Sequence, residues 1–312
     1  MYLLTTCASC AAPIPLSAPK CVRCKTRYCN STCQQDHWRR GHKQICKKIH
    51  RGGNAEQHHA ENKYKEAVAV AAEACADDTK GQTCYICTVA LHWKTKEGLV
   101  RGCACRGAAG FAHVSCLAEQ AKILMDEAEE TNWVAERATA RWRRWEKCSL
   151  CEQNYHGVVA CALGWACWKT YVGRPEDDVI KRMAMTQLGT GLHNAEHYED
   201  ARAIFLAAID SGRTSSNPVI ILDLLRGLAT INRALDRRDE ELDNLREFYA
   251  KTEVAYGRRN EQTYAAAFRL GEVLLEQYYV REALQFLRET GKDLGKDHPL
   301  AIEHAHIYWR CF

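Results

Sequence analysis

The C-terminal half of the chain repeats a helical pattern of apolar residues. The pairs Leu188-Gly189, Leu228-Ala229 and Leu270-Gly271 recur at nearly equal intervals, each in the first helix of an expected helix pair. The second helix of the first pair has apolar residues at i, i+3, i+4, i+7 and i+8, namely Ala201, Ile204, Phe205, Ala208 and Ile209. The third pair shows the same face with Val280, Ala283, Leu284 and Leu287. A period of roughly 40 residues predicts three stacked helix pairs.

Proline and glycine mark the expected boundaries of these helices. Pro218 and Pro299 stand where first helical residues are expected, a position that suits the fixed φ of proline. Gly212, Gly257 and Gly295 stand where helices should end.

Three further helices are expected upstream of the repeats. Ala60–Ala76 has its small apolar residues on one face. An extended helix is expected from about Ser115 through Trp145, with several tryptophans available for packing. Val158–Trp168 is apolar all round, which predicts a buried helix that includes Cys161 and Cys167. It is far shorter than the roughly 20 apolar residues that a membrane span needs.

The repeats resemble tetratricopeptide repeats of the kinesin-light-chain type. Leu294–Pro299 is similar to the connector between repeats of that family, and Gly257–Asn260 holds the equivalent place one repeat earlier. Glu241 stands where the other two pairs have alanine, so the packing of the middle pair is the least regular. Phe312 falls inside the first helix of a fourth pair, which either caps the array or belongs to a truncated sequence. The resemblance implies a groove that binds extended peptides or helices.

The cysteine content changes the picture of the N-terminal half. The chain has 18 cysteines and 13 histidines in 312 residues, a length that predicts two or more domains. The cysteines form Cys-x-x-Cys pairs with histidines between them, a spacing typical of metal sites rather than of disulfides. The start of the chain lacks the charged residues and apolar run of a signal peptide. We therefore expect zinc sites in a reducing compartment, the cytosol or the nucleus.

The formal charge of +4 does not indicate a nucleic-acid-binding protein. With fourteen thiolates and four zinc ions the charge becomes −2. Residues 1–51 hold ten Lys or Arg against a single acid, Asp36, and seven thiolates with two zinc ions reduce that surplus from nine to six. This is a basic face, but nucleic acid is disfavoured as a partner.

The first set of candidate zinc ligands comprises Cys7, Cys10, Cys21, Cys24, Cys29, Cys33, His42 and Cys46. The last four form two i, i+4 pairs, which puts both ligands of a pair on one helix face. The spacing, the aromatic Tyr28 before the fifth ligand and the His37-Trp38 pair resemble the MYND zinc finger. This resemblance implies an interleaved pairing, with one zinc on Cys7, Cys10, Cys29 and Cys33 and another on Cys21, Cys24, His42 and Cys46.

No catalysis is expected at this first set, because eight ligands for two metals leave no open coordination position. Each bound ion should instead stabilise the fold by on the order of 10 kcal/mol. The resemblance implies a docking surface for short peptides that often contain proline. The alternative is a folded cap that binds nothing else.

The second set of candidate ligands comprises Cys84, Cys87, Cys103, Cys105, His113, Cys116, Cys148 and Cys151. A PHD finger has the same composition, but normally with a wider third pair, a shorter gap to the histidine and an aromatic where this chain has Glu146. The pattern is more similar to the RING-CH (RING-variant) finger. That resemblance implies one zinc on Cys84, Cys87, His113 and Cys116 and another on Cys103, Cys105, Cys148 and Cys151.

The RING-CH family contains ubiquitin ligases, which position a ubiquitin-conjugating enzyme and have no catalytic group of their own. The family contacts that enzyme through an apolar residue in the first Cys-x-x-Cys, which Ile86 supplies here. An aromatic after the sixth ligand and a basic residue after the eighth are missing, because those positions hold Gln120 and Glu152. The gap between the sixth and seventh ligands, Cys116 and Cys148, is also long.

Residues 51–80 are expected to link the two fingers. His58 and His59 are expected to be solvated, since both ligand sets are complete without them. Cys75 is expected to be a packing residue.

These observations predict a mainly α, multi-domain protein. We expect a MYND-type finger at 1–50, a helical linker at 51–80, a RING-CH-like finger with a long helical insertion at 81–157 and tetratricopeptide-like repeats at 158–312. Two small zinc domains of the treble or cross-brace type would thus join a C-terminal α-helical solenoid. No phosphate-binding glycine loop, nucleophile elbow or deaminase motif is present in the sequence.

The predicted function is that of a zinc-binding adaptor for protein–protein interaction, with four zinc ions per chain. Its partners would be proteins or peptides bound by the MYND-type finger and the repeats, and no membrane is expected. The first alternative is a RING-type ubiquitin ligase that recruits a conjugating enzyme through residues 81–157. The second is a PHD-like chromatin reader, which the ligand spacing disfavours.

Overall fold

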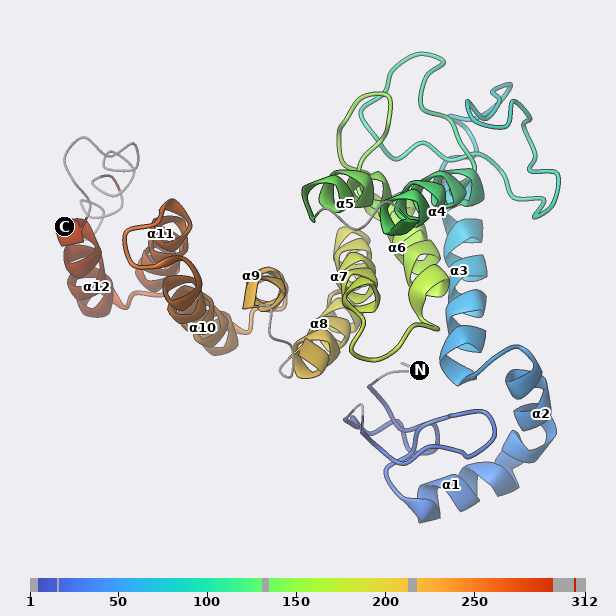
Figure 1. The fold of residues 1–312 in the computed structure, drawn as a ribbon, viewed down its shortest axis with the longest axis horizontal. Helices are drawn as coiled ribbons and strands as arrows, with labels where there is room; N and C mark the ends of the chain where they lie inside the picture. The colour runs from blue at the N-terminus through green and yellow to red at the C-terminus, as the bar shows by residue number, and fades with distance from the viewer. Residues whose placement is uncertain (1–4, 16, 131–134, 213–217, 294–305, 307–312) are drawn as a thin grey trace. The chain divides into compact units, whose positions relative to one another are not determined.

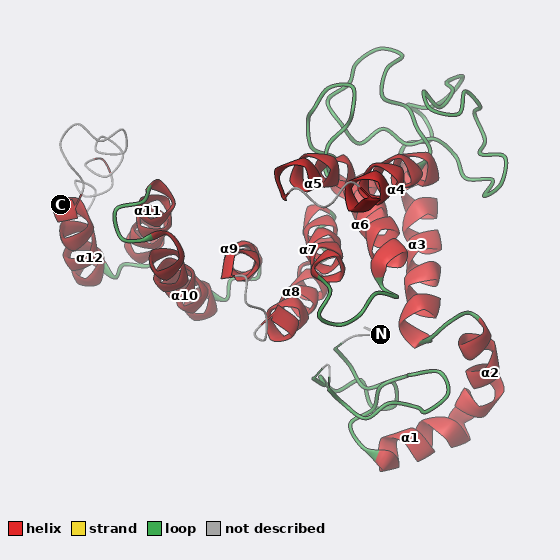
Figure 2. Ribbon diagram, in the orientation of Figure 1, coloured by secondary structure: helices red, strands yellow, loops and turns green. Residues whose placement is uncertain are grey.

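The computed structural model describes residues 5–15, 17–130, 135–212, 218–293 and 306 (Figure 1). The protein is mainly helical, as predicted, and Figure 2 shows helices joined by loops, with no strand among the residues described. The chain divides into two compact units, residues 1–211 and 212–312. The finer division at residues 50, 80 and 157 stays a prediction.

The first unit holds both Cys/His regions and most of its helices lie between and after them. Its elements are α1 (Ser31–His37), η1 (Trp38–His42), α2 (Lys43–Arg51), α3 (Ala55–Ala74), α4 (Val114–Glu130), α5 (Ala135–Trp142), η2 (Arg143–Trp145), α6 (Gly157–Tyr171), α7 (Val179–Asn194) and α8 (Tyr198–Gly212). The second unit consists of α9 (Pro218–Ala234), α10 (Arg238–Tyr256), α11 (Glu261–Glu276) and α12 (Val280–Asp293).

Three helix pairs share one turn geometry. The central residues of the turns, Glu196, Asp236 and Tyr278, are left-handed with φ of 63°, 57° and 65°. In each turn the next residue donates its N–H to the carbonyl five positions earlier, at 2.8 to 2.9 Å. Equivalent hydrogen bonds that recur with the period of the sequence confirm the predicted helical repeats.

The boundaries that proline and glycine predict for the repeat helices hold where the structure describes them. Pro218 is the first residue of α9 and Gly212 the last residue of α8. Gly257 follows α10 with φ 86°, the left-handed region that glycine adopts without a steric penalty. The expected boundaries at Gly295 and Pro299, the connector Leu294–Pro299 and the chain from there to Phe312 lie outside the described helices.

Helices α3, α6 and α7 lie side by side in the first unit (Figure 1). α3 begins earlier than predicted because Asn54 caps it, accepting from the N–H of Gln57 at 2.9 Å. α6 is buried as predicted, and it crosses α7 closely enough that a Cβ on Gly191 would lie 2.7 Å from the carbonyl oxygen of Ala160. The predicted linker helix, α3, therefore packs against α6. We call α3, α6 and α7 together the helical body.

The extended helix expected over residues 115–145 is wrong. α4 ends at Glu130, and α5 packs back against α4. Arg141 donates to the carbonyl of Leu124 at 3.4 Å and lies 3.7 Å from Glu127. A continuous helix of this length would carry its end about 45 Å away. It would separate Cys148 from Cys103, which the fold instead brings together.

The histidines of α3 differ from their predicted exposure. His59 is half-buried, with its ring edge-on to Trp165 at a centroid distance of 5.9 Å. Burial lowers the pKa of His59 to about 4, so this side chain is neutral at physiological pH. Cys75, expected to pack, is half-buried with its Sγ 3.9 Å from the carbonyl of Arg101.

A buried ion pair joins the N-terminal finger, defined here as residues 5–51, to the helical body. The Arg27 side chain is 1% exposed and lies 2.8 Å from Glu56 of α3 and 3.6 Å from Glu176 before α7. The N–H of Ala55 also donates to the carbonyl of Cys24 at 2.7 Å. The finger is thus attached to α3 by both side-chain and backbone contacts.

Replacing Arg27 alone should loosen this attachment. We expect Arg27→Met to destabilise the finger–α3 contact by about 3 kcal/mol, because Glu56 is left buried without its cation. The double variant Arg27→Met/Glu56→Leu should recover most of that loss. Native-state hydrogen exchange of the first turns of α3 measures both. Equal protection in the single variant and the natural protein would contradict this role for Arg27.

The middle repeat contains a buried carboxylate. Glu241 is 1% exposed, whereas the equivalent Ala201 and Ala283 are fully buried small residues. Gln277 donates to Glu241 at 3.3 Å, and Arg233 and Arg238 lie 3.9 Å away. Burial raises the pKa of Glu241 despite the two arginines. Glu241 can therefore replace the alanine of the other two pairs because Gln277, Arg233 and Arg238 surround its carboxylate.

The burial of Glu241 makes the free energy of unfolding depend on pH. The folded-state pKa of Glu241 lies above its unfolded value, so stability falls as pH rises through the folded pKa. We expect Glu241→Gln, which keeps an acceptor for Gln277, to stabilise α9–α11 by about 1 kcal/mol at pH 7. The gain should vanish below about pH 4, where the natural carboxyl is protonated. Hydrogen exchange of α10 at both pH values tests this, and a gain that persists in acid would refute the explanation.

Candidate metal centres

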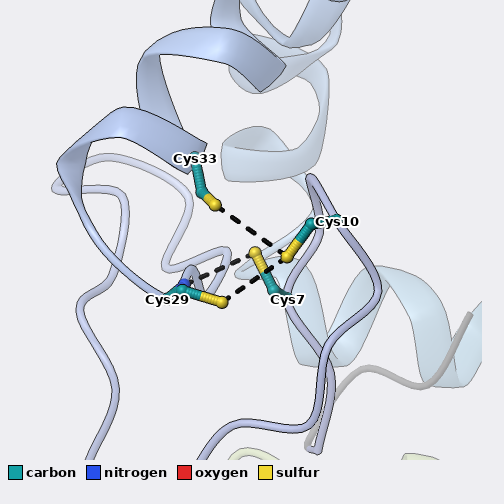
Figure 3. Close-up of side chains that lie close together, drawn as sticks. All are labelled: Cys7, Cys10, Cys29 and Cys33. Carbon is teal, nitrogen blue, oxygen red and sulfur yellow. Dashed lines mark hydrogen bonds between the residues drawn. The ribbon is translucent and has the colours of Figure 1, made fainter.

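The structure brings the sixteen predicted ligands into four groups of four. In each group the ligand atoms all lie within 4.8 Å of one another. The groups are Cys7, Cys10, Cys29 and Cys33; Cys21, Cys24, His42 and Cys46; Cys84, Cys87, His113 and Cys116; and Cys103, Cys105, Cys148 and Cys151. Figure 3 shows the four sulfur atoms of the first group pointing toward one another. These are the sets that the two family resemblances imply.

The distances between ligand atoms fit tetrahedral zinc. Zn–S bonds of about 2.3 Å at tetrahedral angles place two sulfurs about 3.8 Å apart, and a sulfur and a histidine nitrogen about 3.6 Å apart. Sγ of Cys10 lies 3.5 Å from that of Cys29 and 3.9 Å from that of Cys33. Nδ1 of His113 lies 3.3 Å from Sγ of Cys87. Each group can therefore hold one metal ion without rearrangement.

Four Cys-x-x-Cys loops share one backbone conformation. The residue after the second cysteine is left-handed in every loop, with φ between 57° and 64°, at Ala11, Lys25, Thr88 and Glu152. Its N–H donates to the carbonyl of the first cysteine at 2.8 to 3.0 Å. The first cysteine in turn donates to the carbonyl five residues later. This double hydrogen bond turns both thiols toward the same point.

Short helices supply the remaining ligands of the N-terminal finger. Asn30 caps α1 by accepting from the N–H of Cys33 at 3.0 Å, so Cys29 lies just before the helix rather than on it as expected. Gly41, with φ 128°, kinks the chain inside η1, just before α2. The kink leaves His42 and Cys46 on successive turns that face the same group, as the i, i+4 spacing predicts.

Hydrogen bonding orients the histidine of the third group. His113 Nε2 donates to the carbonyl of Ala90 at 3.2 Å, which leaves Nδ1 unprotonated and facing Cys87 and Cys116. A backbone carbonyl is a usual second partner of a metal-binding histidine.

Backbone amides favour the thiolate form at several cysteines. Burial alone would raise the pKa of the Cys7 thiol, but backbone N–H groups, among them those of Ser9 and Cys29, lower it to about 6. A hydrogen bond from the backbone N–H of Gln153 similarly lowers the pKa of Cys151 to about 7. Thiolates are the form that binds zinc.

The groups are chemically closed. Four protein ligands complete a tetrahedral zinc site and leave no position for a water nucleophile or a substrate. Cys75, Cys161 and Cys167 belong to none of the four groups, and neither do His58 and His59. The geometry supports structural rather than catalytic metal.

Several exposed apolar residues of the central Cys/His region, residues 84–151, were missed by the sequence reasoning, among them Leu150 and Trp93. Leu150 occupies in its Cys-x-x-Cys loop the place that Ile86 occupies in the first loop, and this shared position was the available signal. Trp93 is exposed on a turn, His92–Glu97, that repeats the hydrogen bonding of the metal loops without cysteines. No feature of the sequence marks that turn.

Comparison with known proteins identifies the first region. Residues 7–46 match the family model of the MYND finger. Over 41 residues the chain is 51% identical to ubiquitin C-terminal hydrolase 15 of Oryza sativa subsp. japonica, a match that covers 13% of this chain and 4% of that protein. The chain thus spans a small fraction of that relative, and the likeness is limited to those 41 residues.

A solved structure was also matched, BtubC (BKLC) from P. vanneervenii. Its TM-score is 0.42 at 11% sequence identity, over 64% of this chain and 87% of that one. The helical repeats are instead established by their three equivalent turns and the hydrogen bonds of these turns. MYND fingers typically bind proteins, so the match at residues 7–46 indicates a role in protein interaction.

Among the described residues, no helix is both long and apolar enough to cross a membrane.

Removing one ligand should remove one metal ion. We expect four zinc ions per chain by elemental analysis of the purified protein, and three for Cys148→Ser, because three ligands cannot close the site. Cys75→Ser, which changes a cysteine outside the groups, should keep four. The α7–α12 helices should persist in both variants by circular dichroism. Four ions in Cys148→Ser, or about two in the natural protein, would contradict the assignment.

Proposed function

We propose that this protein is a non-enzymatic adaptor that binds four zinc ions and docks partner proteins through its MYND finger and its helical repeats. The observation that carries the proposal is the closure of all four Cys/His groups by protein ligands. Metal in such sites stabilises folded surfaces and offers no reactive position. The free thiols throughout the described chain support a reducing compartment, the cytosol or the nucleus.

The MYND finger offers an exposed aromatic for docking. Trp38 is 40% exposed, and its ring meets that of His42, a proposed zinc ligand, edge-on at 5.9 Å. His42 also stacks on His37 at 4.8 Å, and the Tyr28 hydroxyl hydrogen-bonds His37 at 3.0 Å. A tryptophan held in this way is a rigid anchor of the kind that dominates peptide binding. We assign it to the short, often proline-containing peptides that MYND fingers bind.

The helical repeats would supply a second binding surface. Stacked helix pairs form an extended face on which a peptide or helix can lie. Within the second unit α10 packs against α9 and α11, and α11 against α12, and the equivalent turns at Asp236 and Tyr278 support the repetition that such a face requires.

One observation favours a ubiquitin ligase as the second candidate. Ile86 and Leu150 are 37% and 52% exposed on two Cys-x-x-Cys loops, and the Tyr85 hydroxyl joins these loops by a hydrogen bond to Ser149 at 3.1 Å. A RING-CH-like finger would use such an apolar pair to bind a conjugating enzyme. Against it, Glu152 stands at the expected basic position.

Glu152 is also engaged within the chain. Arg144 donates to both of its carboxylate oxygens, at 2.8 and 2.9 Å. A carboxylate held in this way presents an acceptor where the family presents a cation, so we rank the adaptor first.

The docking role of Trp38 can be tested with a matched control. A proline-containing peptide selected by phage display on the full chain should bind Trp38→Ala about tenfold more weakly, because the aromatic anchor is lost. Trp93→Ala removes an exposed tryptophan outside the MYND finger and should leave the affinity unchanged. Fluorescence polarisation measures both. Equal binding by Trp38→Ala would remove Trp38 from the docking surface.

The ligase alternative is decided by a ubiquitin-transfer assay on the full chain with a panel of conjugating enzymes. We expect no transfer and no binding of a conjugating enzyme, since Gln120 and Glu152 replace the family's contact residues. Transfer that is lost in Cys84→Ser and reduced in both Ile86→Ala and Leu150→Ala would replace the adaptor with a ligase.

A further inference from the structure

The outward face of α2 in the MYND finger carries a row of cations. Lys43, Lys47 and Arg51 follow one another at i, i+4 and i+8 and are all exposed, as is the neighbouring Lys48. Cys46 and Ile49 form the buried face of the same helix. Residues four apart lie above one another on a helix, so the three charges stand about 6 Å apart along one line.

None of the cations in this row forms an ion pair with a described residue. The single acid of residues 1–51, Asp36, is already engaged by Arg40 at 2.6 Å and by the Ser9 hydroxyl at 2.9 Å. Like charges at i, i+4 repel and destabilise an isolated helix.

The helix dipole does not account for the row. Arg51, in the last turn, lies at the negative end of the dipole, where a cation is favourable. Lys43, the first residue of α2, lies at the positive end, where an acid would be preferred. A partner that brings negative charge would relieve the repulsion along the whole row.

An exposed aliphatic residue borders the cations. Ile45 is 47% exposed, three residues before Lys48 and four before the buried Ile49. Its side chain therefore lies between Lys48 and the buried face of α2, and not beside the row itself, from which Lys48 separates it. The surface combines a line of positive charges with an apolar residue beyond Lys48.

We propose that this α2 face binds an acidic peptide whose carboxylates match the spacing of the cations and whose terminal apolar residue reaches Ile45 past Lys48. The inference rests on the proposed docking role of the MYND finger and names the chemistry of a partner. An extended peptide places alternate side chains on one face about 6.6 Å apart, close to the separation of successive cations along α2.

The surface fits a peptide better than a nucleic acid. Phosphates would use the cations, but an aliphatic side chain such as Ile45 adds nothing to a phosphate contact. The surplus of positive charge in this finger is also reduced to six by its thiolates and zinc ions. A peptide with both acidic and apolar residues uses every feature of the face.

The test measures binding of a fluorescein-labelled peptide of alternating glutamate and serine with leucine at each end. Its twin has glutamine in place of every glutamate. The full chain is compared with Lys43→Glu/Lys47→Glu/Arg51→Glu and with a control of equal charge change in the same finger, Lys20→Glu/Arg23→Glu/Lys25→Glu. The control residues are exposed and lie in or next to the second Cys-x-x-Cys loop.

We expect the α2 variant to bind the acidic peptide at least about tenfold more weakly and the control variant to bind it within about twofold of the natural chain. The glutamine twin should not bind, and rising salt should weaken the acidic peptide. Zinc content and circular dichroism verify the fold. If charge reversal disturbs folding, the milder variant Lys43→Gln/Lys47→Gln/Arg51→Gln is used instead. It should also bind the acidic peptide more weakly than the natural chain.

Three results would overturn the inference: no binding of the acidic peptide, equal losses in both charge-reversal variants, or tighter binding of a DNA duplex that depends on the α2 cations. The proline-containing peptide selected above is measured in parallel. If it still binds through Trp38 while the acidic peptide does not bind, the α2 assignment fails and the docking role remains. If neither the acidic peptide nor the proline-containing peptide binds, the docking role of the MYND finger fails as well.

Discussion

Tetrahedral coordination by thiolates and imidazoles is the constraint on which the N-terminal part of this protein depends. Four of the seven residues in the buried cluster of the MYND finger, Cys7, Cys21, Cys24 and Cys46, belong to the candidate metal groups. Thiolates held this close repel one another unless a cation lies between them. We therefore expect metal binding and folding to be coupled in this finger. The four shared loop conformations show how little chain is needed to prepare such a site.

The helical body gives the two Cys/His regions a common support. α3 and α6 pack along each other although the whole central Cys/His region lies between them in the sequence. That region is therefore an excursion between two adjacent helices, and both of its ends are anchored. The MYND finger is attached to the same α3 through Arg27 and the backbone of Ala55. Each Cys/His region therefore presents its exposed residues from the same helices.

The exposed apolar residues of both regions have a common origin. Val22, Ile86 and Leu150 all stand between the two cysteines of a Cys-x-x-Cys loop, where both thiols turn inward and the intervening residues face solvent. A zinc loop thus exposes side chains that a helix or strand of the same length would bury in part. Such positions add little to stability unless a partner buries them.

The grouping of the cysteines and histidines, the helical repeats and those repeat boundaries that the structure describes followed from the sequence by itself. Cysteine spacing reflects the local geometry of a short loop, and the period of the repeats reflects the stacking of like units, so both are visible without a fold. The tertiary structure alone decided that residues 115–145 turn back as α4 and α5. That turn depends on joining Cys148 to Cys103, a contact between distant residues that no local periodicity records. The burial of Glu241, the half-burial of His59 and the exposure of Trp93 were likewise decided by neighbours far along the chain, because solvent exposure is a property of packing and not of residue type.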